Sequence, residues 1–180
     1  MHSFFMKMRG EGKSPPRVSL KEVLVSSVGA FLGIFAVGFL GHLVHLEQQD
    51  ILFLIGSFGT SAVLLYGTPG VPLAQPRNLM GGHILSAFTG VLIYEWIAEP
   101  LYLSGALSVA TAIAVMHLTK TTHPPGGATA LIAVIGGERV HQLGFLYVLS
   151  PMALGALIML VVALIVNNLT SFRRYPVFWW

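Results

Sequence analysis

The chain has 180 residues, of which 54% are hydrophobic and 9% are charged, and its mean hydropathy is +0.76. Soluble domains carry about 25% charged residues, so these values exclude an ordinary soluble domain and indicate an integral membrane protein. The formal net charge is +3 and cysteine is absent, which excludes disulfides and thiolate metal ligands. The basic residues are concentrated at 7–21 and 173–174, a distribution that fits the positive-inside rule better than a nucleic-acid-binding patch.

The hydrophobic pattern predicts an all-α membrane protein with four full transmembrane helices and two short broken helices. Residues 1–21 are predicted to be a cytoplasmic tail, residues 22–170 one transmembrane domain, and residues 171–180 a cytoplasmic tail at the membrane interface. The stretches near the ~20 residues that a bilayer requires are residues 23–44, 79–97, 101–118 and 143–166. The shorter apolar stretches, residues 51–66 and 128–135, each follow or contain glycine or proline near their start.

The order of these stretches is long, short, long, and then the same again, in halves of about residues 22–98 and 101–168. If all six segments cross the membrane, similar halves form a 3+3 inverted repeat, as in many transporters. The loop charges support crossing, because it places Arg77 and Lys120 on the side of the basic tails. It leaves four acidic residues outside: Glu47, Asp50, Glu99 and Glu138. The alternative is that the short segments are re-entrant, which reverses the sides of Arg77, Lys120 and Glu99.

The second short segment has a polar entrance, T121-T-H-P-P-G-G127, in an otherwise apolar region. A helix that begins inside a membrane leaves its first N–H groups without intrahelical partners, and these groups, with the helix dipole, form an anion site. Gly126 and Gly127 allow a ligand to approach the backbone closely, Pro124 and Pro125 stop the helix from extending backwards, and Thr129 adds a hydroxyl.

The first short segment offers the same chemistry through Ser57, Gly59, Thr60 and Ser61. In an inverted repeat the two half-helix N-termini meet near the membrane centre, so the sequence predicts a small-anion site on a permeation route. The alternative interpretation is that H-P-P-G-G is only a tight turn between helices.

Three motifs resemble one known family. T122-H-P-P-G-G-A-T-A-L131 resembles the signature of the HPP family of integral membrane proteins, and G56-S-F-G-T-S-A-V-L-L65 and L73-A-Q-P-R-N78 followed by G81-G-H83 resemble its first-half pattern. The resemblance covers roughly residues 20–170. It implies four transmembrane helices, with His123, Pro124 and Pro125 as signature positions. Because family members in plastids and cyanobacteria are associated with nitrite transport, it also implies nitrite as the candidate substrate.

Two further histidines are candidates for the same cavity. His83 lies within a predicted span and His117 points along a face that leads towards Thr121. The predicted substrate-binding residues are therefore His123, Pro124, Pro125, Gly126, Gly127, Thr129, Ser57, Gly59, Thr60, Ser61, His83 and His117. No metal, cofactor or enzymatic activity is expected, because no carboxylate ligand set and no nucleophile–base pair is evident.

The expected protein is a multi-pass transporter in the cell inner (plasma) membrane, with both termini cytoplasmic. Its expected partners are a small anion, nitrite above all, and the lipid bilayer. Small-residue faces such as Gly29 and Gly33 suggest a homo-oligomer. A channel of other selectivity and a non-transporting membrane scaffold or subunit stay open as alternatives.

Overall fold

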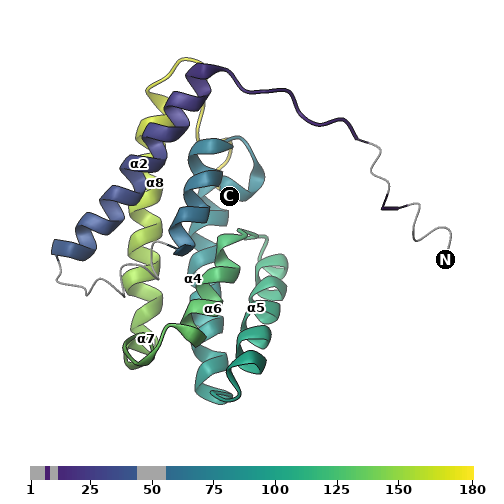
Figure 1. Cartoon of the computed structure of the whole chain (residues 1–180), viewed down its shortest axis with the longest axis vertical. Coiled ribbons are helices and arrows are strands. Elements are labelled where there is room, and N and C mark those ends of the chain that lie inside the picture. Colours follow the sequence, from purple (N-terminus) through teal and green to yellow (C-terminus); the bar gives the residue numbers. More distant parts are fainter. Residues whose placement is uncertain (1–6, 9–11, 44–55) are drawn as a thin grey trace.

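The computed structural model describes residues 7–8, 12–43 and 56–180, and all regular structure in these ranges is helical (Figure 1). The α-helices are α2 (Leu20–Leu43), α4 (Pro76–Trp96), α5 (Leu101–Leu118), α6 (Pro125–Ile135), α7 (Glu138–Leu143) and α8 (Leu154–Asn168). Three turns of other helical types are η1 (Val63–Gly67), η2 (Pro72–Ala74) and η3 (Val148–Ala153). Residues 56–62 are α-helical and continue into η1, and we call residues 56–67 the first short helix. Glu47 and Asp50, predicted to face the outside, lie beyond the described residues.

Three helical stretches in the described chain are long and apolar enough to cross a membrane: Leu20–His42, Leu101–Leu118 and Val148–Asn168. The remaining expected span, α4, has 21 residues but is less apolar than these three stretches. It is the central helix, packed against α5, α6, η3 and α8, so much of its surface faces protein. Polar residues such as His83 and Ser86 can therefore lie on its buried face.

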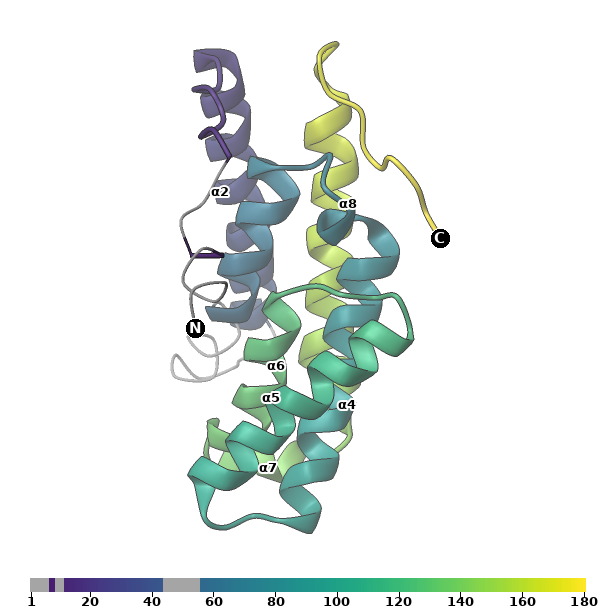
Figure 2. The same ribbon diagram turned by 90° about the vertical axis from the view of Figure 1, so that its right-hand side faces the viewer.

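The helices form two groups that meet along α4. In Figures 1 and 2, α2 and α8 run side by side, while α5 and α6 lie against the opposite face of α4. Glycine brings α4 and α6 close together, because a Cβ on Gly90 would lie only 2.5 Å from the carbonyl oxygen of Ala130. Such small-residue contacts let two helix backbones approach each other within a membrane.

Several helix ends differ from the predicted ones for reasons of proline geometry. The second short helix begins at Pro125 rather than at residue 128, because proline is well suited to the first position of a helix. The predicted span 143–166 is divided: α7 ends at Leu143, and the chain kinks at Ser150 before Pro151. Proline lacks an N–H and clashes with the preceding turn, so the helix is distorted there into a π-type turn.

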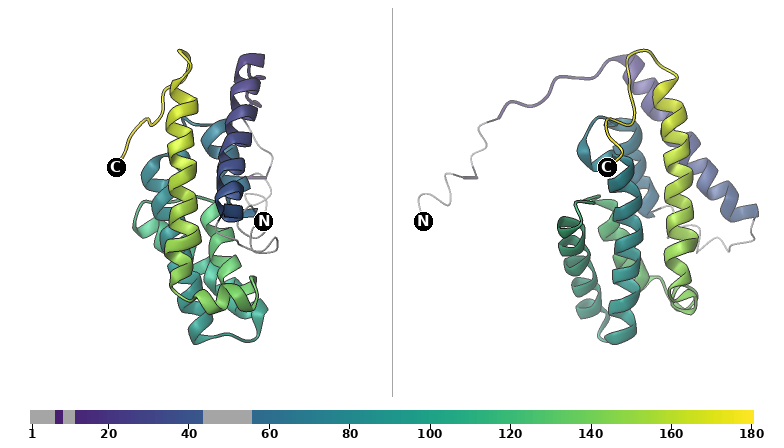
Figure 3. Two further views of the ribbon diagram at one scale, coloured as in Figure 1. Left: turned by 90° about the vertical axis from the view of Figure 1, so that its left-hand side faces the viewer. Right: turned by 180° about the vertical axis from the view of Figure 1, so that it is seen from behind.

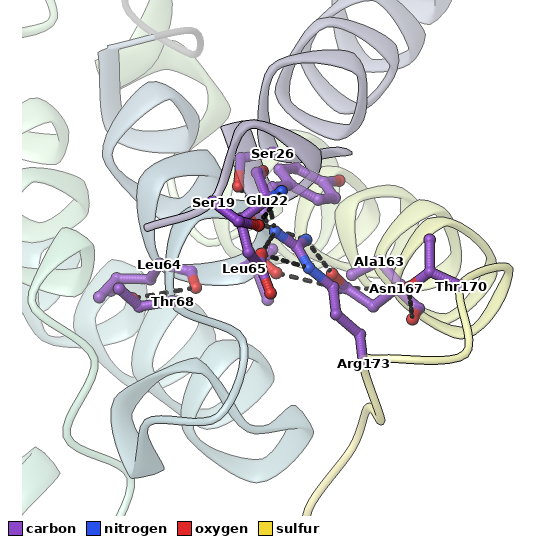
Figure 4. Close-up of polar contacts among 11 residues, drawn as sticks. Ser19, Glu22, Ser26, Leu64, Leu65, Thr68, Ala163, Asn167, Thr170 and Arg173 are labelled. Atoms are coloured by element: carbon purple, nitrogen blue, oxygen red, sulfur yellow. Dashed lines mark hydrogen bonds and ion pairs between the residues drawn. The ribbon is translucent and has the colours of Figure 1, made fainter. Parts of the chain in front are cut away.

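The C-terminal tail is tied to the bundle by Arg173, whose side chain is only 3% exposed (Figure 4). Its Nε donates to Glu22 Oε2 at 2.8 Å, and the same carboxylate forms an ion pair with Nη2. Its Nη1 donates to the carbonyl oxygen of Tyr66 at 3.0 Å and to Asn167 Oδ1 at 2.9 Å. One side chain thus joins α2, the end of the first short helix and α8.

Beyond Arg173 the tail folds back onto the loop that precedes α4 (Figure 3). The Tyr175 hydroxyl donates to the carbonyl oxygen of Ala74 at 2.8 Å, and the Val177 N–H donates to Gln75 Oε1 at 2.8 Å. The Gln75 amide in turn donates to the carbonyl oxygens of Pro69 and Val71, both at 2.9 Å. Because Tyr175 is only 2% exposed, this part of the tail packs against protein.

Candidate functional site

A cluster of polar side chains is sealed inside this apolar bundle. Its members, all 0% exposed, are Ser57, Ser61, His83, His123 and Thr129, and we call them the polar cluster. A buried polar group without a hydrogen-bond partner costs several kcal/mol in an apolar medium, roughly 2–7 kcal/mol. A sealed cluster of this kind is therefore stable only if its members satisfy one another.

Four separate parts of the chain supply the polar cluster. Ser57 and Ser61 are four residues apart and so face the same side of the first short helix. His83 lies on the buried face of α4, and His123 lies in the turn that precedes α6. Thr129 lies just after the first turn of α6, on the side that faces the first short helix.

The two short helices meet at their N-terminal parts. The hydroxyl oxygens of Ser57 and Thr129 are 2.7 Å apart, and the Ser57 hydroxyl also reaches the carbonyl oxygen of Pro125 at 3.2 Å. Figure 2 shows the first short helix and α6 leaving this meeting point in opposite directions. The N-terminal parts of the two short helices are therefore in contact within the described residues.

Ser61 links the two histidines. Its hydroxyl oxygen lies 2.8 Å from His83 Nε2 and 2.9 Å from His123 Nε2. The other nitrogen of His83, Nδ1, is 2.8 Å from Thr129 Oγ1. The other nitrogen of His123, Nδ1, is 2.8 Å from the carbonyl oxygen of Leu73. Both imidazoles therefore use both of their nitrogens, and the cluster is a continuous chain of hydrogen bonds.

Aromatic rings close the cluster from the sides. The ring of Phe58 lies 4.9 Å from that of His83, and the His83 and His123 rings are 5.0 Å apart in an edge-on arrangement. The hydroxyl of Tyr147, also fully buried, donates to the carbonyl oxygen of Thr129 at 3.0 Å. These contacts fix the ring planes, so the nitrogen atoms point along defined directions.

The backbone amides predicted to bind an anion already have partners. The Gly126 N–H donates to the carbonyl oxygen of His123 at 2.8 Å, and the Gly127 N–H donates to that of Pro124 at 3.0 Å. Neither glycine is in the left-handed region, so neither is required there by a positive φ. An anion could use these two amides only after the turn bonds opened.

The two glycines differ in what surrounds them. A Cβ on Gly126 would lie 2.8 Å from the carbonyl oxygen of Gly82 and 2.7 Å from Ser86 Oγ, so Gly126 is a close helix contact. A Cβ on Gly127 would meet only Val109, at 3.8 Å. Gly127 thus faces α5, away from the polar cluster.

Three predicted residues, Gly59, Thr60 and Pro124, line an open groove of about 500 Å³ beside the polar cluster. The groove is completed by Gly56, Val63 and Leu64. Pro125 is buried at the start of α6, whereas His117 is exposed on α5 and takes no part in the hydrogen bonds of the polar cluster. Within the described residues, no group of three His, Cys, Asp or Glu side chains is placed to hold a metal ion.

The site also uses groups that the sequence did not reveal. The carbonyl oxygen of Leu73 accepts from His123, but any residue supplies such a carbonyl, so no residue type marks it. Asn78 holds the start of α4 beside the signature, since its Nδ2 donates to the carbonyl oxygen of Thr122 at 2.8 Å. Phe58 and Tyr147 are ordinary core aromatics in the sequence, and only their positions make them neighbours of the site.

Comparisons with known proteins support the family resemblance of the H-P-P-G-G motif, which contributes His123 and the start of α6. Residues 15–176 match the family described as HPP, transmembrane region. The chain belongs to the HPP family. It is therefore a multi-pass membrane protein that is embedded in a lipid bilayer.

Two curated relatives come from Dictyostelium discoideum, and both are named only as transmembrane proteins. One is 48% identical over 180 residues, which cover 98% of this chain and 57% of the relative. The other is 42% identical over 182 residues, covering 98% of this chain and 63% of the relative. This HPP chain thus spans about three fifths of the length of these relatives. No solved structure matches it.

Proposed function

We propose that this HPP protein is a transporter of a small inorganic anion, with nitrite as the first candidate, and not an enzyme. The observation that carries the proposal is the polar cluster, formed where the N-terminal parts of two short helices meet inside an apolar bundle. Broken helices that meet in this way are the usual construction of a transporter binding site. Polar and ionisable groups within a membrane protein are costly, and such residues often mark substrate or ion pathways.

Basic residues at one end of the site support the choice of an anion. Asn78 bonds to the Thr122 carbonyl and so holds the start of α4 beside the end of α5. Arg77 precedes Asn78 and Lys120 lies two residues before Thr122, so both charges are close in sequence to this contact, where they would attract anions. Nitrite itself comes from the family resemblance and not from a contact in the site.

The proposed arrangement in the membrane has six crossings and a 3+3 inverted repeat, with α4 as a less apolar crossing and the two short helices as shorter crossings. Both termini are cytoplasmic in the inner (plasma) membrane, because this orientation keeps Arg77, Lys120 and the basic tails on the inside. The polar cluster would then lie near the middle of the membrane.

A membrane scaffold is the second candidate, and one observation favours it. The amides of Gly126 and Gly127 are bonded to nearby carbonyls, so the turn before α6 is already satisfied without a ligand. A scaffold needs the H-P-P-G-G turn only for packing, and the contact of Gly126 with Gly82 and Ser86 is such a packing role.

Flux measurements on purified protein in liposomes separate these two functions. The test compares uptake of nitrite, nitrate, formate and chloride with that of protein-free vesicles. We expect saturable nitrite uptake that is slowed in Ser57→Ala, because this change removes a hydroxyl at the helix junction. Ser86→Ala is the matched control, since the Ser86 hydroxyl is equally buried but has no hydrogen-bond partner among the residues that the structure describes. Absence of protein-dependent flux for all four anions would favour the scaffold.

A further inference from the structure

We propose that the polar cluster is a directed proton relay, and that this HPP protein moves protons through it. The proposal deepens the transport function and rests on it for the coupling of protons to the anion. The movement of protons itself is a separate property and is measured separately.

The direction of the relay is set at one end by Leu73. A carbonyl oxygen can only accept a hydrogen bond, so His123 carries its proton on Nδ1, 2.8 Å away. In the neutral ring the other nitrogen, Nε2, is then an acceptor. Ser61 must donate its single proton to His123 Nε2, at 2.9 Å.

The same reasoning fixes every bond further along. With its proton committed to His123, Ser61 can only accept from His83, so His83 carries its proton on Nε2. The Nδ1 of His83 is then an acceptor, and Thr129 donates to it at 2.8 Å. Ser57 in turn donates to Thr129 at 2.7 Å. With both imidazoles neutral, all five hydrogen bonds are satisfied in a single direction. This requires the two rings to be in opposite tautomers.

An added proton reverses the direction of the hydrogen bonds between His123 and Thr129 without breaking them. If His123 is protonated on both nitrogens, it donates to Ser61, and Ser61 is free to donate to His83 Nε2. His83 then donates from Nδ1 to Thr129. At the far end Thr129 donates to Ser57, and Ser57 donates to the Pro125 carbonyl oxygen at 3.2 Å. The cluster thus holds one extra proton with every hydrogen bond retained.

Proton passage follows from these two arrangements. A proton that binds Ser57 Oγ displaces the Ser57 proton onto Thr129, and successive transfers through His83 and Ser61 place a proton on His123 Nε2. The Leu73 carbonyl oxygen accepts a hydrogen bond but takes no proton, so the Nδ1 proton is released to water when the His123 ring turns away from that oxygen. Rotation of the rings and hydroxyls then restores the starting tautomers. Each transfer breaks one O–H or N–H bond and forms another, so no oxidant or reductant is required.

The two ends of the relay differ in access. Ser57 lies between Gly56 and Thr60, which line the open groove, so the Ser57 end is beside a route to the surface. The His123 end meets the loop that contains Leu73 and leads into α4. A chain of hydrogen bonds between a groove and a loop is the geometry that proton transfer requires.

The other titratable side chains near the two histidines form contacts elsewhere or are exposed. The relay is therefore the shortest hydrogen-bonded connection between the two rings. The hydroxyl of Tyr147 is directed to the Thr129 carbonyl, that of Tyr66 to the Met159 carbonyl, and that of Tyr175 to the Ala74 carbonyl. α6, which packs most closely on α4, contains no titratable side chain. On α4 itself, Arg77 lies over the ring of Phe178, and Tyr94 stacks on His141. Glu95 and, on α5, Tyr102 and His117 are exposed.

The decisive variant is Ser61→Ala, which removes the single group between the two histidines. Ser86→Ala is again the control, because it deletes an equally buried hydroxyl from α4 that lies outside the relay. Liposomes with a pH-sensitive dye inside report proton movement, and nitrite uptake is followed in the same vesicles with and without a pH gradient. Protein-free vesicles give the passive background of both.

We expect a pH gradient to drive nitrite uptake by the unaltered protein. Ser61→Ala should lower proton movement by about 100-fold or more, the lower end of what a positioned proton-transfer group contributes. Thr129→Ser keeps a hydroxyl and should keep the coupling, whereas Thr129→Val should lose it. Wild-type proton movement in Ser61→Ala would overturn the relay.

The remaining outcomes separate the relay from the transport function. Nitrite flux without any proton movement overturns the relay and leaves anion transport standing. Proton movement without flux of any tested anion supports the relay and overturns anion transport. Absence of both movements overturns both proposals.

A measurement on the folded protein tests the relay without transport. In bilayers containing ¹⁵N-histidine-labelled protein, nitrogen chemical shifts distinguish the two neutral tautomers. We expect the proton on Nδ1 of His123 and on Nε2 of His83, with the signals assigned from His83→Asn and His123→Asn. Identical tautomers for the two rings would overturn the directed chain.

Discussion

The His123 imidazole donates from Nδ1 to the carbonyl oxygen of Leu73, 50 residues earlier in the chain, at 2.8 Å. This contact fixes the tautomer of His123, and through Ser61 it also fixes that of His83. A loop carbonyl can set a tautomer only if the loop itself is held. The C-terminal tail holds this loop, because Tyr175 bonds to the neighbouring residue, Ala74.

Removing the hydroxyl of Tyr175 should therefore disturb the site from a distance. Burial raises the pKa of Tyr175, so its hydroxyl remains a proton donor at neutral pH. Tyr175→Phe leaves the buried Ala74 carbonyl without this donor and should cost about 1–2 kcal/mol of stability. We expect slower proton movement and a changed His123 Nδ1 chemical shift. The control is Tyr102→Phe, on an 82% exposed ring, which should change neither quantity.

Arg173 should be important for stability, whereas its neighbour Arg174 should not. Arg173→Gln breaks a largely buried ion pair with Glu22 and should destabilise the protein by about 2–4 kcal/mol. The melting temperature in detergent should then fall by at least about 5 °C. Arg174→Gln changes an exposed side chain and serves as the control with the same change of charge. Equal melting temperatures for the two variants would show that the Arg173 contacts contribute little.

The two adjacent glycines at the start of α6 should respond in opposite ways to one added methyl group. Gly126→Ala forces a Cβ against the Gly82 carbonyl and Ser86, which should cost about 1–3 kcal/mol. Gly127→Ala places its Cβ at 3.8 Å from Val109, in a helix with no positive φ there, and should stabilise by about 0.4–1 kcal/mol. Thermal stability in detergent measures both, and a more stable Gly126→Ala would contradict the close packing of α4 and α6.

Cysteine labelling tests the six-crossing arrangement directly, because the native chain has no cysteine. Single cysteines at Arg77 and Lys120 should be protected from an impermeant reagent added outside, and one at Glu99 should react. Labelling at Glu138 should match that at Glu99. Outside labelling at position 77 or 120 would instead indicate that the short helices are re-entrant.

The sequence by itself determined the class of the protein and the parts of its site. Long apolar stretches and few charges can only be accommodated by helices in a bilayer, because every backbone polar group must be satisfied there within the segment. The helix Leu101–Leu118 coincides with its predicted bounds, since it is mainly apolar and is preceded by a proline. Short helices with a polar entrance indicated Ser57, Ser61, His123 and Thr129 as candidate residues, and a histidine within a predicted span indicated His83.

Only the tertiary structure decided how those residues are used. The sequence suggested backbone amides at Gly126 and Gly127 as anion donors, but local turn bonds engage both amides. Which hydroxyl lies between the two histidines depends on how the first short helix, α4 and α6 cross, and sequence spacing does not contain that information. The acceptor that sets the direction of all these hydrogen bonds is the main-chain oxygen of Leu73, which any residue type could supply. Hydrogen-bond direction is thus a property of the assembled core, since each bond's polarity is fixed by the next bond along the chain.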